Sequence, residues 1–459
     1  MGQATRSTLE NLLKDFYVGP IQETLNTEVL AVEMFEKLRL DWNGKQVIIP
    51  VHSARSAATV DIAGGGDTQD AKYTDIADGG SSVAFGTETG DLPVAANQTY
   101  LQLTVTAKQL FGRFQITGLA MASAKSGGVG SFASYVDAEM NRLADDLKNL
   151  ANRAFFSGGH VLGLLHEKKS TAADKEWEFC GDIAKCNSVR TERAADVSVT
   201  LRRSDTMAEV AGSPELLSTV NLDRATIEFD GAVDTEAVPG GVAIWLEVTD
   251  ANANVDYLDN EVGGVMNNLG KNSHFGNTRS DAGSAGLRSV VRTASKEAPV
   301  AGQVKSSKAT MALEQLQDVL DQIDVRSGAV PDVLLCHPVM RQEYIKLCQG
   351  TVNINLAGGG ALAKGDAGVL NISYNNIPFK AARQCPRGLV FFLQTKGWKL
   401  AQLEAPGFAD LDGAILSRVN NKDAFDGYYR WYFDLVCTSP STQGVLTGID
   451  FSGAGAGEA

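Results

Sequence analysis

The feature that most constrains this chain is a long, weakly apolar segment between two predicted strands. Residues 46–51 (QVIIPV) and 99–106 (TYLQLTVT) favour strands, and apolar and polar side chains alternate in the second. Residues 52–98 between them are rich in glycine and aspartate. A connection of this length is uncommon inside a compact domain. We therefore expect a projecting β-hairpin that becomes ordered against a partner.

The N-terminal segment also lacks a local surface on which to pack. Residues 7–18 predict an amphipathic helix, with Ser7 and Glu10 at the spacing of a capping box. A second helical pattern follows Pro20 and covers residues 21–32. Both apolar stripes therefore predict a contact with a partner.

The strongest helical pattern covers residues 131–156. At 1.5 Å per residue, such a helix is a rod of roughly 37 Å. Its expected apolar face contains Phe132, Tyr135, Val136, Met140, Leu143, Leu147 and Leu150.

The rest of the chain favours a β-rich region followed by a mixed one. Residues 160–305 contain short alternating runs separated by turns, at 197–201, 225–229 and 242–248, and end in a loop-like stretch at 263–286. Residues 308–350 predict helix, strand and helix, and a glycine-rich loop follows at 351–368. Further strands are expected at 370–374, 389–393, 398–403 and 428–436.

Charge and composition exclude several classes of protein. The net charge of -14 disfavours general binding to nucleic acid or to an anionic membrane. Neither an apolar run long enough to span a membrane nor a signal peptide is found in the sequence. Of the six cysteines, Cys180 and Cys186 form the one close pair, and we expect all six to be reduced thiols.

The sequence offers no recognisable catalytic pattern. It has no HExxH, GxSxG or EF-hand motif, and the nearest phosphate-loop match, at Gly270-Lys271, has Val265 and Asn272 at positions that need glycine and a hydroxyl. None of the five histidines is spaced as a metal pair on a helix, namely His52, His160, His166, His274 and His337. We therefore predict no catalytic, cofactor-binding or metal-binding residues and no enzymatic activity.

Four segments, in their order and spacing, resemble the major capsid proteins of tailed bacteriophages, which have the Hong Kong 97 phage capsid fold. Residues 11–30 (NLLKDFYVGPIQETLNTEVL) and 100–125 (YLQLTVTAKQLFGRFQITGLAMASAK) are typical of one branch of that family. Residues 374–403 and 408–449 resemble it most. The resemblance covers about two-thirds of the chain and implies an α+β capsid fold.

The resemblance also implies a division of the chain. It gives an N-terminal arm at 1–45, an extended loop at 46–106, a peripheral domain with its long spine helix at 107–159, a β-rich insertion domain at 160–305, an axial domain at 306–385, completion of the peripheral domain at 386–450, and a flexible tail at 451–459. The insertion is where this sequence departs from the minimal fold.

The function implied by the resemblance is self-assembly, as pentamers and hexamers, into an icosahedral shell around double-stranded DNA. The expected partners are other copies of the chain, a separately encoded scaffolding protein, a portal protein and a decoration protein. DNA would be enclosed without sequence-specific binding, no membrane would be involved, and shells assembled in the bacterial cytoplasm would form the virion. The alternatives are a nanocompartment shell that encloses a cargo enzyme and a β-rich tail or surface binding protein.

Overall fold

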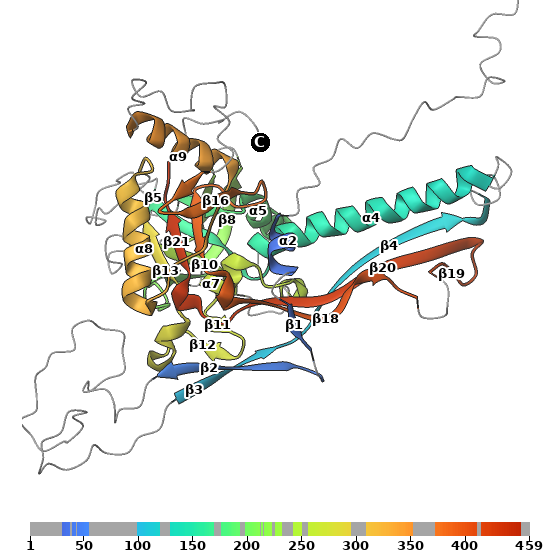
Figure 1. The fold of residues 1–459 in the computed structure, drawn as a ribbon, viewed down its shortest axis with the longest axis horizontal. Coiled ribbons are helices and arrows are strands. Elements are labelled where there is room, and N and C mark those ends of the chain that lie inside the picture. Colours follow the sequence, from blue (N-terminus) through green and yellow to red (C-terminus); the bar gives the residue numbers. More distant parts are fainter. Residues whose placement is uncertain are drawn as a thin grey trace, which may run out of the picture.

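The chain, seen in a computed structural model, combines helices with several β-sheets (Figure 1). The structure describes residues 30–36, 39–42, 44–54, 99–119, 129–168, 176–192, 198–211, 213, 215–222, 225–231, 242–249, 256–294, 309–351, 372–410 and 415–450. The predicted helix at 7–18 and residues 21–29 of the second predicted helix lie outside these residues. So do all but the first three residues of the predicted loop at 52–98 and all but the first residue of the glycine-rich loop at 351–368. No helix in the described part is long and apolar enough to cross a membrane.

A long sheet projects from the body of the molecule beside helix α4 (Val129–Ser157) (Figure 1). Its central strand, β20 (Ala424–Cys437), pairs antiparallel with β4 (Lys108–Thr117) on one side and with β18 (Trp398–Phe408) on the other. The short strands β19 (Ser417–Arg418) and β1 (Arg39–Asp41) pair with β20 and β18. The predicted helix at 131–156 and the strands predicted at 398–403 and 428–436 are thus confirmed.

Helix α4 packs on this sheet through one stripe of residues. Leu147, Ala151 and Phe155 follow each other at four-residue spacing and are buried. Gly112 of β4 leaves room for the Leu147 side chain, which allows helix and strand to approach closely. Leu150 was predicted on this face, but 51% of it is exposed. The prediction for Leu150 is wrong because the residues of α4 that contact the sheet recur at every fourth position, and position 150 is not one of them.

Helix α2 (Leu30–Glu36) sits at the base of α4. The Phe35 ring lies 5.4 Å from the ring of Phe155 and 5.5 Å from that of Trp398. The backbone N–H of Ala31 donates to Oδ1 of Asn152 over 2.8 Å, so a side chain of α4 caps the start of α2. The C-terminal end of the predicted N-terminal arm is therefore fastened to its own chain.

The β-rich character predicted for residues 160–305 is confirmed by a closed six-stranded barrel. Its strand order is β10-β5-β6-β9-β8-β7. The strands are β5 (Val161–Lys168), β6 (Glu176–Gly181), β7 (Ser198–Arg203), β8 (Glu215–Asn221), β9 (Thr226–Phe229) and β10 (Ile244–Thr249). Helix α5 (Ile183–Glu192) follows β6, and a separate apolar cluster that includes Trp177, Phe179 and Phe229 fills the interior.

A six-stranded sheet forms the other large unit, with the order β13-β21-β17-β14-β16-β15. Helices α8 (Leu313–Ser327) and α9 (Pro338–Thr351) flank it, which confirms the predicted helix, strand and helix (Figure 1). Its strands are β13 (Val290–Thr293), β14 (Val333–Cys336), β15 (Ser373–Tyr374), β16 (Ile377–Ala381), β17 (Leu389–Leu393) and β21 (Gly444–Thr447), and short 3-10 turns occur at η2 (Thr395–Gly397) and η3 (Pro440–Thr442). Residues 386–450 therefore contribute strands to both this sheet and the long sheet.

The two strands that enclose the long loop pair with each other as predicted. β2 (Val47–Ala54) and β3 (Thr99–Val105) form an antiparallel ribbon. The ribbon is fastened to a small hairpin of β11 (Ser273–His274) and β12 (Asn277–Thr278). The backbone N–H of Thr104 donates to the carbonyl of Phe275 over 3.0 Å, and Nδ2 of Asn277 donates to the carbonyl of Gln102 over 2.8 Å.

The prediction of a loop-like stretch at 263–286 was wrong. This segment contains α7 (Val265–Gly270), the β11–β12 hairpin and the 3-10 turn η1 (Ala282–Leu287), and the short helix α6 (Asp256–Asn260) precedes it. Val265, Met266 and Leu269 are fully buried. The elements are too short to show a period, and the asparagines and glycines that hold them have the composition of a loop.

Candidate functional site

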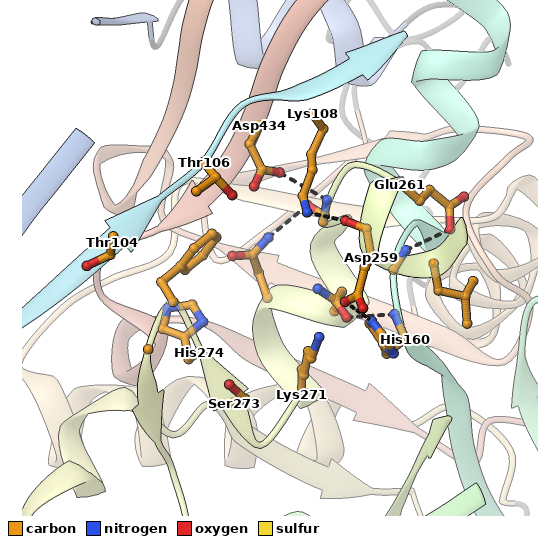
Figure 2. Close-up of a pocket in the computed structure, with 17 residues that line it drawn as sticks. Thr104, Thr106, Lys108, His160, Asp259, Glu261, Lys271, Ser273, His274 and Asp434 are labelled. Carbon is orange, nitrogen blue, oxygen red and sulfur yellow. Dashed lines mark hydrogen bonds and ion pairs between the residues drawn. The ribbon is translucent and has the colours of Figure 1, made fainter. Parts of the chain in front are cut away.

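A polar pocket of about 220 Å³ opens where the long sheet, the ribbon and the neck of the barrel meet (Figure 2). Thr104, Thr106 and Lys108 line one wall, at the point where β3 gives way to β4. The opposite wall is the segment from Leu258 to Gly276, and His160 and Asp434 complete the lining. Residues far apart in the sequence thus share one cavity.

The pocket rests on a buried polar framework. Nδ2 of Asn268 donates to the carbonyls of Gly263 and Leu435 over 2.8 and 2.9 Å, and its Oδ1 accepts the N–H of Cys437 over 3.1 Å. This one side chain therefore joins α7 to β20. Buried polar groups that are satisfied in this way fix one arrangement of the chain, because breaking them leaves unpaired groups.

His274 and Arg279 form the floor of the same framework. Arg279 is fully buried and donates from Nη2 to Nδ1 of His274 over 3.0 Å. Since Nδ1 accepts this bond, Nε2 of His274 carries the proton and donates to the carbonyl of Cys437 over 2.8 Å. Burial and the neighbouring Arg279 hold the pKa of His274 well below its usual value, so the ring is neutral.

One ion pair and one hydrogen bond of a histidine, whose pKa is lowered by burial, hold the neck of the barrel. Nζ of Lys185 donates to Glu261 Oε2 over 2.7 Å and to the carbonyls of Ser157 and Gly159 over 2.7 and 2.8 Å. Burial lowers the pKa of Lys185, although Glu261 opposes this. Nε2 of His160 lies 2.8 Å from Oδ1 of Asp259. Gly159 adopts φ +93°, a conformation that favours glycine, and turns the chain from α4 into β5.

Asp434 is the most perturbed carboxyl group of the pocket. It lies on β20 with 3% of its surface exposed, and its Oδ1 accepts the N–H groups of Gly263 and Leu435 over 3.1 and 2.9 Å. Burial raises the pKa of Asp434 to about 7, against the opposing effect of these N–H groups and of Lys108 and Lys271. The group therefore gains or loses a proton near neutral pH.

Two lysines face the cavity. Lys108 donates from Nζ to the backbone carbonyl of Asp259, whereas Lys271 approaches from the opposite wall (Figure 2). Burial and the charge of Lys108 lower the pKa of Lys271, and the charges of Asp259, Glu247 and Asp434 partly offset this. The pocket can thus exchange a proton and attract an anion.

The phosphate-loop match and the histidines of the sequence occupy separate places in the fold. Lys271 comes after α7 and not before a helix, so the Gly270-Lys271 match is not a phosphate loop. His160 and His274 line the pocket, His52 lies on β2 against Tyr100, and His337 follows β14. The side chain of His166 lies outside the described residues.

Lys108, Asp259 and Asp434 line the pocket but were not predicted from the sequence as site residues. The one available signal was Asp434 itself, a charged residue within the apolar strand segment Phe433–Val436. Among the described residues, no group of three histidine, cysteine, aspartate or glutamate side chains is placed to hold a metal ion.

The described cysteines are free thiols, as predicted. Burial raises the pKa of Cys186, Cys336 and Cys437 to about 12, so these thiols are protonated.

Similarity to known proteins is found in the structure and not in the sequence. No family model matches the sequence, and no curated protein is similar to it in sequence. Among solved structures, a chain of the Cyanophage A-1(L) capsid asymmetric unit aligns with a TM-score of 0.58 and 10% identity, covering 97% of this chain and 99% of that chain.

Two further alignments are weaker. The capsid of a native GTA particle gives a TM-score of 0.45 and 9% identity, covering 98% of this chain and 100% of that chain. A holo-SrpI encapsulin complex from Synechococcus elongatus gives 0.42 and 8%, covering 98% of each chain. These two scores are too low to establish a shared fold. The cyanophage alignment shows that the chain has the fold of a phage capsid chain, which confirms the predicted resemblance at the level of the fold.

Proposed function

We propose that this chain is the major capsid protein of a tailed bacteriophage, a structural subunit that assembles as pentamers and hexamers into an icosahedral shell around double-stranded DNA. The observation that carries the proposal is the alignment, over nearly the whole of both chains, with a chain of the Cyanophage A-1(L) capsid. In this role the chain acts through its surfaces, and we propose no catalytic step for it.

The long sheet provides a surface suited to contact between subunits. One face of the sheet packs on α4 through Gly112, and the opposite face exposes the neighbouring Phe111, which is 51% accessible. The Phe111 ring stacks edge-on against Tyr432 at 5.8 Å. A paired aromatic group of this kind supplies contact area at low entropic cost when another subunit covers it.

Ion pairs border this aromatic group. Arg113 Nη2 lies 2.7 Å from Asp426 Oδ2, and Arg430 pairs with Glu404. Aromatic groups within a charged rim are typical of protein interfaces, where the rim sets register more than affinity. The face therefore supports a contact with a second copy of the chain.

Each unit of the fold corresponds, in this proposal, to a domain of the capsid family. The six-stranded sheet with α8 and α9 would be the axial domain, predicted at 306–385, with β13, β17 and β21 added from outside those bounds, and the long sheet with α4 would be the peripheral domain. The β2–β3 ribbon would be the base of the extended loop, α2 the end of the N-terminal arm, and the barrel the insertion domain.

The proposed partners are other copies of the chain, a separate scaffolding protein, a portal protein and a decoration protein. The net charge of -14 supports enclosure of DNA without a tight grip on it, because phosphates are repelled. The proposed location is the virion shell, assembled in the host cytoplasm.

Electron microscopy of the expressed full chain, with and without a candidate scaffolding protein, tests the proposal. Closed shells are expected from the expressed chain. Shells that contain DNA are expected in lysates of infected cells, where packaging takes place. Shells that contain a protein cargo would instead support a nanocompartment, and rods or trimers would support a tail or surface protein. Deletion of residues 64–90 should give soluble subunits that form no shells.

A substitution on the exposed sheet face gives a sharper test. Phe111→Glu should leave a folded subunit and abolish shells, because it places a charge in the proposed contact. Leu222→Glu is the matched control, since Leu222 is 47% exposed after β8 of the barrel, away from the long sheet. Normal shells from Phe111→Glu would show that this face is not an assembly surface.

A further inference from the structure

The pocket at the neck of the barrel contains hydrogen-bond donors that its own residues do not use. Nζ of Lys271, Nδ2 of Asn267 and the hydroxyl groups of Thr104, Thr106 and Ser273 line it, and none has a hydrogen-bond partner within the described part of the chain. Asn267 uses only its Oδ1, which accepts the N–H of His160 over 2.9 Å. A pocket with spare donors is suited to a ligand rich in acceptors.

The charges that face the pocket leave its cations incompletely neutralised. Lys108 and Lys271 approach from opposite walls (Figure 2), and burial together with the charge of Lys108 lowers the pKa of Lys271. Lys108 is bonded to a backbone carbonyl of Asp259 and not to its carboxylate, which faces His160.

The remaining acidic groups are engaged elsewhere or are neutral for part of the pH range. Glu261 is held by Lys185, and Glu247 by Arg202 at 2.8 Å. Asp434, which Lys108 and Lys271 face from β4 and from the end of α7, has a pKa of about 7. When it is protonated, the two lysines face one ionised carboxylate, that of Asp259, among the described residues of the pocket.

We propose that this pocket binds a small tetrahedral oxyanion, of the class of inorganic phosphate, between Lys108 and Lys271, and that Asp434 takes up a proton as the anion binds. Charge-assisted hydrogen bonds from the two ammonium groups supply most of the attraction, and the hydroxyl groups of Thr106 and Ser273 complete the coordination. The proton on Asp434 removes a buried negative charge that would repel the ligand.

The position of the site gives the anion a structural consequence. Thr104, Thr106 and Lys108 lie at the junction of the ribbon with the long sheet, and Lys271 lies on the segment that leads from the barrel. A bound anion therefore links the ribbon, the sheet and the barrel neck. The same chemistry is present in free phosphate and in the phosphodiester backbone of DNA, so the test distinguishes these two sources.

Calorimetric titration of the full chain with sodium phosphate, at constant ionic strength and near pH 7, tests the proposal. Saturable binding of one anion per chain is expected. Because phosphate itself titrates near pH 7, proton uptake is measured with sodium sulfate, a tetrahedral anion that does not, in buffers of different ionisation enthalpy. Competition by a short DNA duplex would assign the site to backbone phosphates, and lack of competition would assign it to a free anion.

Three variants complete the test. Lys271→Gln and Lys108→Gln should each weaken phosphate binding about tenfold or more, since each removes a charge-assisted bond. Lys346→Gln on α9, an exposed lysine paired with Glu343, is the matched control and should bind as the unmodified chain does. Asp434→Asn should still bind phosphate, and its proton uptake with sulfate should be smaller than that of the unmodified chain, with any remainder taken up by Lys271, whose pKa is lowered.

The proposal is overturned if the unmodified chain shows no saturable binding, or if both lysine variants bind as well as the control. Proton uptake with sulfate that is undiminished in Asp434→Asn would refute the role given to Asp434. Circular dichroism of each variant shows whether a loss of binding arises from unfolding. If one lysine variant is unfolded, the other still tests the site.

Discussion

Replacement of Asp434 by asparagine should make the chain more stable at alkaline pH and leave it almost unchanged in acid. The asparagine side chain has nearly the same shape, and its Oδ1 can still accept the N–H groups of Gly263 and Leu435. The variant therefore keeps the hydrogen bonds of the neutral carboxyl group and removes the buried negative charge.

The expected magnitude follows from the pKa. Burial raises the pKa of Asp434 from 3.8 to about 7, so the folded chain binds this proton more tightly than the unfolded chain. The contribution of Asp434 to the free energy of unfolding is fully present below about pH 4. It falls as the pH rises and has been lost, by about 4 kcal/mol in total, above about pH 7. Asparagine does not titrate, so the stability advantage of the variant should grow by about 3 kcal/mol between pH 5 and pH 8.

Urea unfolding of the unassembled full chain at pH 5 and pH 8, in phosphate-free buffer, measures this difference. Asp426→Asn is the matched control, because Asp426 lies on the same strand and pairs with Arg113 on the exposed face. The pKa of Asp426 is lowered, first by the hydroxyl of Ser417, so its replacement should give no gain at pH 8. An equal gain for Asp434→Asn at both pH values would refute the link to protonation.

Three further substitutions test contacts that position the site. Gly112→Val should lower the free energy of unfolding by about 1–3 kcal/mol in urea, because the added carbons overlap with the α4 leucine that packs on β4. Asn152→Ala should cost about 1–3 kcal/mol and speed hydrogen exchange of the α2 amides, since their acceptor is lost; unchanged exchange would contradict the cap. Phe275→Ala should speed exchange of the β2–β3 ribbon, because Phe275 packs into its apolar cluster; protection equal to the unmodified chain would show that the hairpin does not hold the ribbon.

The elements that the sequence predicted correctly are long or strongly apolar. Helix α4 shows its period over many turns, and β17 is a continuous apolar run, LVFFL, all of it buried. β20 combines an alternating half with an apolar half. Such elements carry their own signal, because the burial pattern of each residue follows from its neighbours in sequence.

The candidate site could not be predicted in the same way. Lys108, Asp259 and Asp434 belong to three segments that only the tertiary structure brings together. The segment 263–286 was mistaken for a loop for a related reason: Asn268 bonds to the distant backbone carbonyl of Leu435, and Arg279 donates to the carbonyls of Asn268 and Lys271 within the segment. Residues of this kind resemble loop residues in composition, and their role depends on partners that local sequence does not show.

The location of the pocket bears on how the barrel is connected to the rest of the chain. His160 directly precedes β5, where the chain enters the barrel, and Asp259 follows β10, where the chain leaves it. These two residues face each other at 2.8 Å, so both connections of the barrel form walls of the pocket. The third wall carries Lys108, the first residue of β4, which holds the Asp259 backbone directly. The barrel is thus linked to the long sheet through the residues of the pocket.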